Sequence, residues 1–231
     1  SGSVPHEWIT PRLRAVASLN PDILLRAYAV GLFPMAEHRD DSTLYWIDPE
    51  KRGILPLESF HIPRRLRRKL ARRHFEVRCD SAFEAVIRNC ASPRPGRGET
   101  WINDEIIDLY IELHEMGRAH SVESWRDGDL VGGLYGVTLG AVFFGESMFS
   151  AETDASKVAL VHLVARLRKG GFRLLDTQFV TRHLNQFGAM EIHRGGYRQL
   201  LADALDINAK FHPELEESEF DKFLQSITQT S

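Results

Sequence analysis

The sequence predicts an α+β fold in which helices pack on a β-sheet. Beyond residue 75 the predicted elements follow the order strand, helix, strand, strand, strand, helix, strand. This order predicts an α+β sheet with helices packed on it. The chain has 231 residues, 43% of them hydrophobic and 26% charged. These values are typical of a globular chain with a sizeable core and room for a second, small domain.

The small domain is expected at the N-terminus. Residues 20–31 predict a helix with an asparagine cap, a proline in the first turn and a glycine at the end. Residues 32–35 and 45–49 are expected to form loops that carry aromatic side chains. Prolines and a glycine over residues 49–56 predict a linker. We therefore expect one domain over residues 1–56 and a second beyond it.

The second domain accounts for most of the expected elements. Strands are predicted at residues 75–79, 119–126, 129–138, 141–145 and 172–176, and helices at 81–90, 103–116 and 158–167. Asp127-Gly128 between two of the strands predicts a two-residue hairpin turn. Beyond residue 206 the chain is acidic, and part of this tail, residues 207–231, is expected to dock as a helix.

Basic side chains concentrate in residues 64–78. The chain as a whole has a net charge of −3, but this segment holds eight Lys or Arg residues against one acid, so it carries +7 and the remainder −10. Apolar residues recur every four positions at Ile62, Leu66 and Leu70, which predicts an amphipathic helix. Its cations form two neighbouring rows: Arg64, Arg68 and Arg72 in one, and Arg65, Lys69 and Arg73 in the other. Such a concentration of one sign suits a phosphate backbone.

Several common chemistries find no support in the sequence. It contains no HExxH motif and no P-loop, and its two cysteines, Cys79 and Cys90, match no metal or redox spacing. Gly145 to Phe149 resembles a serine nucleophile elbow, but phenylalanine stands where the turn needs glycine. No metal is expected. No apolar run approaches the roughly 18 residues of a membrane span, and the first four residues lack a secretion signal, so a soluble, trimmed, non-secreted chain is expected.

Polar residues at strand ends are candidates for catalysis. If the backbone stays extended through Gln178, Asp176 and Gln178 project from the same face. A carboxylate beside an amide can orient or deprotonate an amine, but the pair could equally cap the following helix. Glu146, expected at the end of another strand, could hold a cationic substrate group or pair with a structural arginine. Trp101 could stack on a base or belong to the core.

Longer stretches match one known family in order and spacing from about residue 20 to about residue 200. They are Gly31-Leu32-Phe33-Pro34, Tyr45-Trp46, Phe60-His61-Ile62, Thr100-Trp101-Ile102, residues 119–123 (AHSVE), 130–136 (LVGGLYG) and 145–150 (GESMFS), Ala155-Ser156-Lys157 and Asp176-Thr177-Gln178. On these residues the chain resembles the leucyl/phenylalanyl-tRNA–protein transferase family, the aminoacyltransferases of the N-end rule.

The resemblance implies a fold and a reaction. It implies a small N-terminal domain (1–56), an N-acetyltransferase-like domain of the acyl-CoA N-acyltransferase type with a mixed sheet and packed helices (57–206), and the acidic tail (207–231). It implies transfer of Leu, Phe or, less readily, Met from its tRNA to the N-terminal Arg or Lys of an acceptor protein, which creates a degradation signal. No cofactor, metal or membrane partner is expected, and we expect a cytoplasmic monomer.

The resemblance also assigns roles to residues. Asp176 and Gln178 are the expected catalytic pair, with the aspartate acting through the glutamine, and Glu146 is expected to face the acceptor's N-terminus. The expected pocket for the aminoacyl side chain comprises Leu134, Phe143, Met148, Leu160, Leu163 and Leu175. Trp101 and Met35 are expected at the terminal adenosine, and the tRNA phosphates at Arg64, Arg65, Arg68, Lys69, Arg72 and Arg73.

Two residues depart from the family pattern. Met35 and Leu163 stand where the family often has aromatic residues. Adenosine stacking and the preferred amino acid are therefore open. Two alternatives also remain: an acyl-CoA-dependent N-acyltransferase, although the R-x-x-G-x-G/A pyrophosphate loop is missing, and a non-catalytic RNA-binding module.

Overall fold

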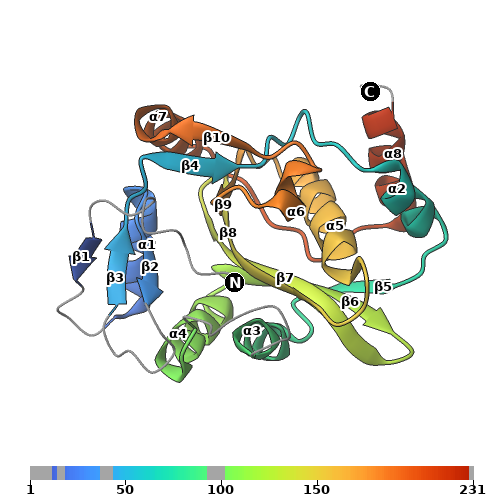
Figure 1. Ribbon diagram of the computed structural model, residues 1–231, viewed down its shortest axis with the longest axis horizontal. Coiled ribbons are helices and arrows are strands. Elements are labelled where there is room, and N and C mark those ends of the chain that lie inside the picture. The colour runs from blue at the N-terminus through green and yellow to red at the C-terminus, as the bar shows by residue number, and fades with distance from the viewer. Residues whose placement is uncertain (1–11, 15–18, 37–43, 93–101, 229–231) are drawn as a thin grey trace.

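The computed structural model describes residues 12–14, 19–36, 44–92 and 102–228 and confirms the α+β architecture (Figure 1). The strands are β1 Arg12–Arg14, β2 Phe33–Ala36, β3 Leu44–Ile47, β4 Lys51–Ile54, β5 Glu76–Cys79, β6 Ala119–Arg126, β7 Asp129–Leu139, β8 Val142–Ser150, β9 Leu174–Gln178 and β10 Met190–His193. The helices are α1 Pro21–Ala29, α2 Arg64–Ala71, α3 Phe83–Ala91, α4 Asp104–Glu115, α5 Ala155–Lys169, α6 Arg182–Asn185, α7 Arg194–Leu205 and α8 Glu217–Thr228.

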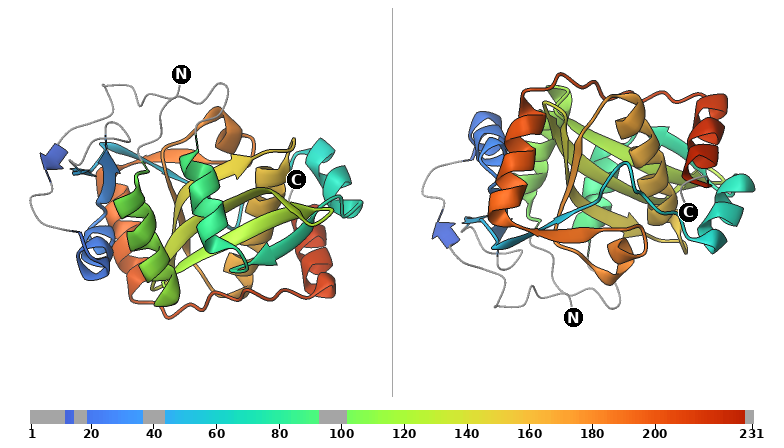
Figure 2. Two further views of the ribbon diagram at one scale, coloured as in Figure 1. Left: turned by 90° about the horizontal axis from the view of Figure 1, so that it is seen from below. Right: turned by 90° about the horizontal axis from the view of Figure 1, so that it is seen from above.

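Two sheets organise these elements. A three-stranded sheet has the order β1-β3-β2, and a seven-stranded sheet has the order β10-β4-β9-β8-β7-β6-β5. All neighbours in the large sheet are antiparallel except β8 and β9, which run parallel, so this sheet is mixed. Helices α3 and α4 lie against one face of it and α5 against the other (Figure 2). Because α5 also has α2 and α8 beside it, it is buried nearly all round.

Local sequence signals were reliable at turns and helix starts. The side chains of Asn20 and Asn103 accept hydrogen bonds from the backbone N–H groups of Ile23 and Ile106, both at 2.9 Å, and so cap α1 and α4 as predicted. Asp127 and Gly128, at φ of 51° and 88°, join β6 to β7 in the predicted hairpin turn.

Two stretches expected as loops, residues 32–35 and 45–49, largely form strands. They contribute β2 and β3, which pair with each other in the small sheet. The expected linker over residues 49–56 was also wrong. Its centre is β4, which lies between β10 and β9 in the large sheet. The division at residue 56 stays a prediction, but the large sheet begins before it, at Lys51.

Glycine explains why β4 was missed. Gly53 is typical of a linker in the sequence, but in the fold it lets β4 approach the end of β9 closely. A Cβ atom at this position would lie 2.5 Å from the carbonyl carbon of Phe179. Short strands with glycine have weak sequence signals, because their stability comes from neighbours distant in sequence.

Two strand limits also differ from the expectation. The strand expected at 141–145 runs to Ser150, so Glu146 lies within β8 rather than at its end. The strand expected at 172–176 is β9, which begins at Leu174 and ends at Gln178.

The acidic tail docks as a helix, as predicted. α8 packs against α5, and the ring of Phe220 stacks on that of His162 with centroids 3.7 Å apart. Ile227 is buried in the same apolar cluster. Glu217 and Asp221 form ion pairs with Arg73, which follows Arg72, the C-cap of α2. The tail is thus held both by apolar contacts and by charge.

Within the described ranges, no helix has the length and apolar character required to cross a bilayer.

Gly132 provides a stability test of the contact between β7 and α5. A Cβ atom on this residue would lie 2.4 Å from the Cβ of Ala155 and 2.9 Å from its carbonyl carbon. We expect Gly132→Ala to lower the free energy of unfolding by about 1–3 kcal/mol, because the helix must move away from the sheet. Urea denaturation measures the change.

The matched control is Gly195→Ala in α7. A Cβ there meets no atom within 4 Å, so alanine should leave stability unchanged or raise it by up to about 1 kcal/mol. Equal effects of the two substitutions would contradict the close approach of β7 and α5.

Candidate active site

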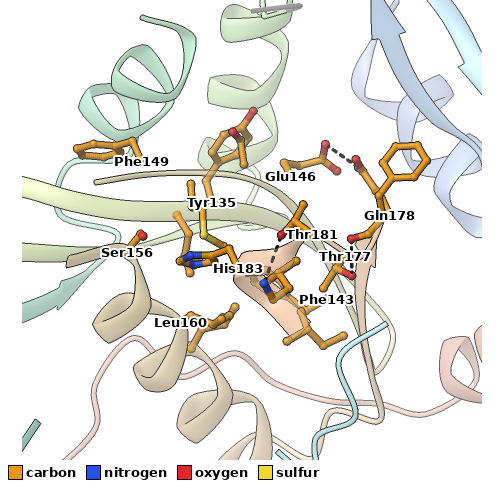
Figure 3. Close-up of a pocket in the computed structure, with 18 of the residues that line it drawn as sticks. Tyr135, Phe143, Glu146, Phe149, Ser156, Leu160, Thr177, Gln178, Thr181 and His183 are labelled. Carbon is orange, nitrogen blue, oxygen red and sulfur yellow. Dashed lines mark hydrogen bonds between the residues drawn. The ribbon is translucent and has the colours of Figure 1, made fainter. Parts of the chain in front are cut away.

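A cavity of about 810 Å³ opens between the large sheet, α5 and the segment that follows β9 (Figure 3). The structure brings together at its wall all six residues of the expected aminoacyl pocket: Leu134, Phe143, Met148, Leu160, Leu163 and Leu175. Met35, Glu146 and Gln178 also line it. The cavity is therefore largely apolar, with an ionisable and an amide group in one region of its wall.

The cavity forms where two parallel strands separate. Residue pairs join β8 to β9 only as far as Phe144 and Asp176, although both strands continue. On its other side β8 contains a bulge, because Gly145 and Ser147 pair with β7 whereas Glu146 between them has no partner in that register. A bulge redirects a side chain. It places Glu146 opposite Gln178, whose Nε2 donates to Glu146 Oε2 at 3.1 Å.

Glu146 is held by two tyrosines behind it. The hydroxyl of Tyr28 on α1 donates to the carboxylate of Glu146 and lies 2.5 Å from the hydroxyl of Tyr110 on α4. Burial raises the pKa of Glu146 to about 7, against the hydrogen bonds of Tyr28 and Gln178, which lower it. Burial also raises the pKa of both tyrosines, so they stay protonated and act as donors. Near neutral pH, Glu146 can therefore gain or lose a proton.

Asp176 has a different environment. It is fully buried. Its carboxylate accepts hydrogen bonds from Nε of Arg52 at 3.0 Å and from Nη2 of the same side chain at 2.5 Å. The hydroxyl of Tyr197 donates at 2.7 Å and the backbone N–H of Gln178 also at 2.7 Å. Asp176 is not among the residues that line the cavity.

Arg52 is itself enclosed. It donates from Nη1 to the carbonyl of Gly31 at 2.7 Å, and its guanidinium lies 4.5 Å from the ring centroids of both Phe33 and Tyr197. Burial lowers the pKa of Arg52, but the charge of Asp176 and its other partners more than offset this, so the net shift is upward. The pair is a buried, fully hydrogen-bonded salt bridge.

The expectation that Asp176 and Gln178 share a face depended on an extended Gln178. Its φ is +63°, so the backbone leaves the extended region at this residue. Gln178 turns to the cavity and Glu146, whereas Asp176 turns to Arg52 and Tyr197. Neither side chain caps the following helix, because Thr181 caps α6 by accepting from the N–H of Leu184.

Four residues of this network were missed from the sequence. Tyr28 and Tyr110 occupy apolar positions of their helices, so each was read only as a core residue. Arg52 fell in the expected linker, and Tyr197 in a region without a motif. The repeated pairing of buried tyrosine hydroxyls with carboxylates becomes visible only after folding.

Comparison with known proteins identifies the family. Two models match: that of the leucyl/phenylalanyl-tRNA protein transferase over residues 54–202 and that of its N-terminal domain over residues 17–50. The chain belongs to the leucyl/phenylalanyl-tRNA–protein transferase family.

Individual relatives agree with this membership. The leucyl/phenylalanyl-tRNA–protein transferase of Paramagnetospirillum magneticum is 67% identical over 193 residues, which cover 84% of this chain and 92% of that protein. Those of Nitrobacter winogradskyi and Maricaulis maris are 62% and 58% identical and cover 87% and 90% of this chain, and 89% and 96% of their own lengths. A solved structure, L-PGS from Bacillus licheniformis, has a TM-score of 0.39 and 11% identity over 71% of this chain and 54% of its own.

Only some of the basic side chains in and next to α2 of the transferase chain are exposed and free of ion pairs. Arg64, Arg65, Arg68 and Arg72 are exposed, and in the part of the chain that the structure describes they form no ion pair. Lys69 instead contacts Asp154 at 3.2 Å, and Arg73 pairs with Glu217 and Asp221 of α8. The complete row formed by Arg64, Arg68 and Arg72, with Arg65 beside it, is thus presented to solvent.

Trp101 lies outside the described residues, so its expected contact with adenosine stays a prediction. His183 lines the cavity, although its sequence context gave no reason to expect this. His120 contacts Asp80 at 2.8 Å and stacks on Phe211, which makes it structural. The described residues contain no group of three His, Cys, Asp or Glu side chains suited to a metal ion.

The raised pKa of Glu146 predicts a pH-dependent stability difference. Folded Glu146 keeps its proton to about pH 7, whereas the unfolded side chain loses it near 4.5, so the folded state binds more protons in between and loses stability as the pH rises. Relative to Glu146→Gln, the wild type should lose up to about 3 kcal/mol between pH 4.5 and 8. Urea denaturation at both pH values measures this.

Glu115→Gln at the exposed end of α4 is the control. Its difference from the wild type should change little over the same interval. A Glu146→Gln difference that is equally independent of pH would contradict the burial of this carboxyl group.

Proposed function

We propose that this chain transfers leucine, phenylalanine or, less readily, methionine from aminoacyl-tRNA to the N-terminal Arg or Lys of an acceptor protein. The single observation that carries the proposal is the apolar cavity with Glu146 and Gln178 in its wall, in a chain of this family. The cavity suits the aminoacyl side chain. The negative charge of Glu146 suits the cationic end of the acceptor.

The reaction is an aminolysis of an ester. The α-amine of the acceptor attacks the carbonyl carbon of the aminoacyl ester, the new C–N bond forms, and the bond to the ribose oxygen breaks. An ester is an activated acyl group, so placing the two substrates together supplies much of the rate enhancement. We propose that Asp176 and Gln178 act as a pair, in which Gln178 faces the substrates and Asp176 acts only through Gln178. The hydrogen bond from the Gln178 N–H to Asp176 supports this.

The pocket favours unbranched or γ-branched side chains. Leu134, Phe143, Met148, Leu160, Leu163 and Leu175 surround it. Met148 and Met35 are flexible and polarisable, which suits tolerance of both Leu and Phe. With leucine at 163 rather than an aromatic residue, the pocket has room for the larger phenylalanine ring.

The tRNA is proposed to bind along α2. Arg64, Arg68 and Arg72 would contact acceptor-stem phosphates, with Arg65 beside them, and Lys69 and Arg73 would contribute after exchanging their protein partners. Phosphates carry no sequence information, so this contact suits a protein that accepts several tRNAs. We propose Trp101 and Met35 at the terminal adenosine.

We further propose that the protein acts in the cytoplasm as a monomer, without a metal, a dissociable cofactor or a membrane partner. A non-catalytic RNA-binding module would need α2 but would leave the cavity and the Glu146–Gln178 contact without a role. An acyl-CoA-dependent enzyme would need a pyrophosphate loop, which the sequence lacks.

A direct assay tests the function. Purified protein is incubated with Leu-tRNA, Phe-tRNA or Met-tRNA and a peptide that begins with Arg, then with peptides that begin with Lys, Asp or Glu. We expect a new peptide bond with Arg and Lys only, detected by mass spectrometry. Absence of transfer from all three tRNAs to any peptide would falsify the assignment.

The salt dependence of tRNA binding tests the interface. Each phosphate contact contributes about one unit to the slope of log affinity against log salt. We expect Arg68→Ala or Arg72→Ala to weaken binding and to lower that slope by about one unit. Arg118→Ala, an exposed arginine between α4 and β6, serves as control and should leave the slope unchanged. Equal slopes for all variants would reject α2 as the binding site.

A further inference from the structure

Two carboxylates lie near the proposed reaction centre, and their surroundings differ. Glu146 lines the cavity. Asp176 is fully buried beneath the cavity wall. Only one of them is placed to exchange a proton with a molecule in the cavity.

Asp176 has no acceptor capacity left for a substrate. One of its oxygens accepts from Arg52 Nε at 3.0 Å and from the Gln178 N–H at 2.7 Å. The other accepts from Arg52 Nη2 at 2.5 Å and from the Tyr197 hydroxyl at 2.7 Å. A donor from the cavity would have to displace one of these hydrogen bonds, and loss of a partner from the buried ion pair would leave a charge uncompensated.

Glu146 still has capacity. Its hydrogen-bond donors are the hydroxyls of Tyr28 and Tyr110 and the amide N–H of Gln178. A carboxylate has about four lone-pair sites, so room for a further donor from the cavity remains. The bulge in β8 aims this side chain at the gap between β8 and β9.

We propose that Glu146, rather than Asp176, accepts the proton of the acceptor's α-ammonium group, and that Asp176 is a positioning residue that fixes the turn at Gln178. This rests on the proposed function and identifies the proton acceptor of that reaction.

Proton energetics agree with the geometry. A peptide α-amino group has a pKa of about 7.7–8.0, and burial raises the pKa of Glu146 to about 7. Transfer between them is therefore nearly balanced. Towards a glutamate at its ordinary pKa, 4.5, the same transfer would cost about 4–5 kcal/mol.

The groups around Glu146 maintain this state. Tyr28 of α1 and Tyr110 of α4 donate hydrogen bonds, whereas the charge of Asp176 on β9 favours the protonated form. Arg52 of β4 and Tyr197 of α7 lie behind Asp176 and interact with Glu146 only through charge. The Arg52 cation is neutralised by Asp176, so it does not hold Glu146 ionised.

The step balances with the named groups alone. The α-ammonium gives one proton to the Glu146 carboxylate, and the freed amine attacks the ester carbonyl. As the C–N bond forms and the C–O bond breaks, the leaving ribose oxygen takes the proton from Glu146. The nitrogen of the new amide still has one proton too many, and it releases this proton to solvent. Glu146 returns to its ionised state without an oxidant, reductant or further co-reactant.

Asp176 acts through the backbone. Gln178 has a φ of +63°, which is unfavourable for a residue with a side chain. The 2.7 Å bond from its N–H to Asp176 holds it there and keeps its amide against Glu146. Asp176, Arg52 and Tyr197 thereby set the orientation of Glu146 without touching substrate.

Single-turnover transfer measured from pH 5.5 to 9 tests the inference. Wild-type protein charged with Phe-tRNA at saturating concentration reacts with increasing amounts of an Arg-peptide. We expect the wild-type rate at saturating peptide to rise as the pH increases, with a midpoint near pH 7. This rising part of the pH–rate profile is called the limb below. Glu146→Gln should lose the limb near 7 and keep only the titration of the α-amine itself near 8. Its rate should fall about 100-fold or more at pH 8, the usual contribution of a general acid–base residue, because the leaving ribose oxygen also loses its proton donor. Its tRNA affinity should not change.

Two variants of the Asp176 network are the controls. Tyr197→Phe removes one donor to Asp176, and Asp176→Asn removes its charge. Both should lower the rate yet keep the limb. It should stay near pH 7 in Tyr197→Phe and move to lower pH in Asp176→Asn, because the charge of Asp176 favours the protonated form of Glu146. Tyr197→Phe remains informative should Asp176→Asn fail to fold.

The outcomes are distinguishable. If the wild type transfers no amino acid, the proposed function fails. If it does and Glu146→Gln raises only the peptide concentration required for half the maximal rate, Glu146 only binds the acceptor and the inference is overturned. Retention of the limb near 7 in Glu146→Gln, with its loss in Asp176→Asn, would overturn it in favour of Asp176.

Discussion

The buried ion pair between Arg52 and Asp176 holds the parts of this molecule together. Its side chains are 1% and 0% exposed, so each charge depends on the other for compensation. The pair joins β4 to β9 within the large sheet. Arg52 also reaches Gly31 and packs on Phe33, which belong to the α1–β2 segment of the N-terminal part. One arginine therefore links the small sheet, the large sheet and, through Tyr197, helix α7.

This ion pair also separates the roles of two acids that the sequence alone treats alike. The same fold surrounds Asp176 with donors and leaves Glu146 in an apolar wall with fewer. Burial in that wall raises the pKa of Glu146 to about 7, and a perturbed carboxyl group beside a cavity is characteristic of acid–base sites. The asymmetry arises from topology: β8 and β9 stop pairing beyond Phe144 and Asp176, so Asp176 lies at the last paired position and Glu146 beyond it.

Sequence reasoning succeeded where the determining contacts are local. Caps at Asn20 and Asn103, the Asp127-Gly128 turn and the apolar stripe of α2 depend on residues within four positions of one another. It failed for β4, because the register of this strand is set by strands more than 120 residues away in the sequence. The salt bridge between Arg52 and Asp176 likewise joins residues 124 positions apart. The six pocket residues came from the family resemblance, and their convergence on one cavity required the fold.

The fold also decides which basic side chains of α2 and its C-terminal end are paired with acids, and the sequence does not show this. The sequence places two basic rows on α2 and makes them equivalent. Folding brings Asp154 against Lys69, and Glu217 and Asp221 against Arg73, so two of the three cations in the second row are paired with acids. This pairing reduces the mutual repulsion of cations that lie one helical turn apart. It also leaves Arg64, Arg68 and Arg72 as a narrow exposed stripe, which defines one direction along which a phosphate backbone can lie.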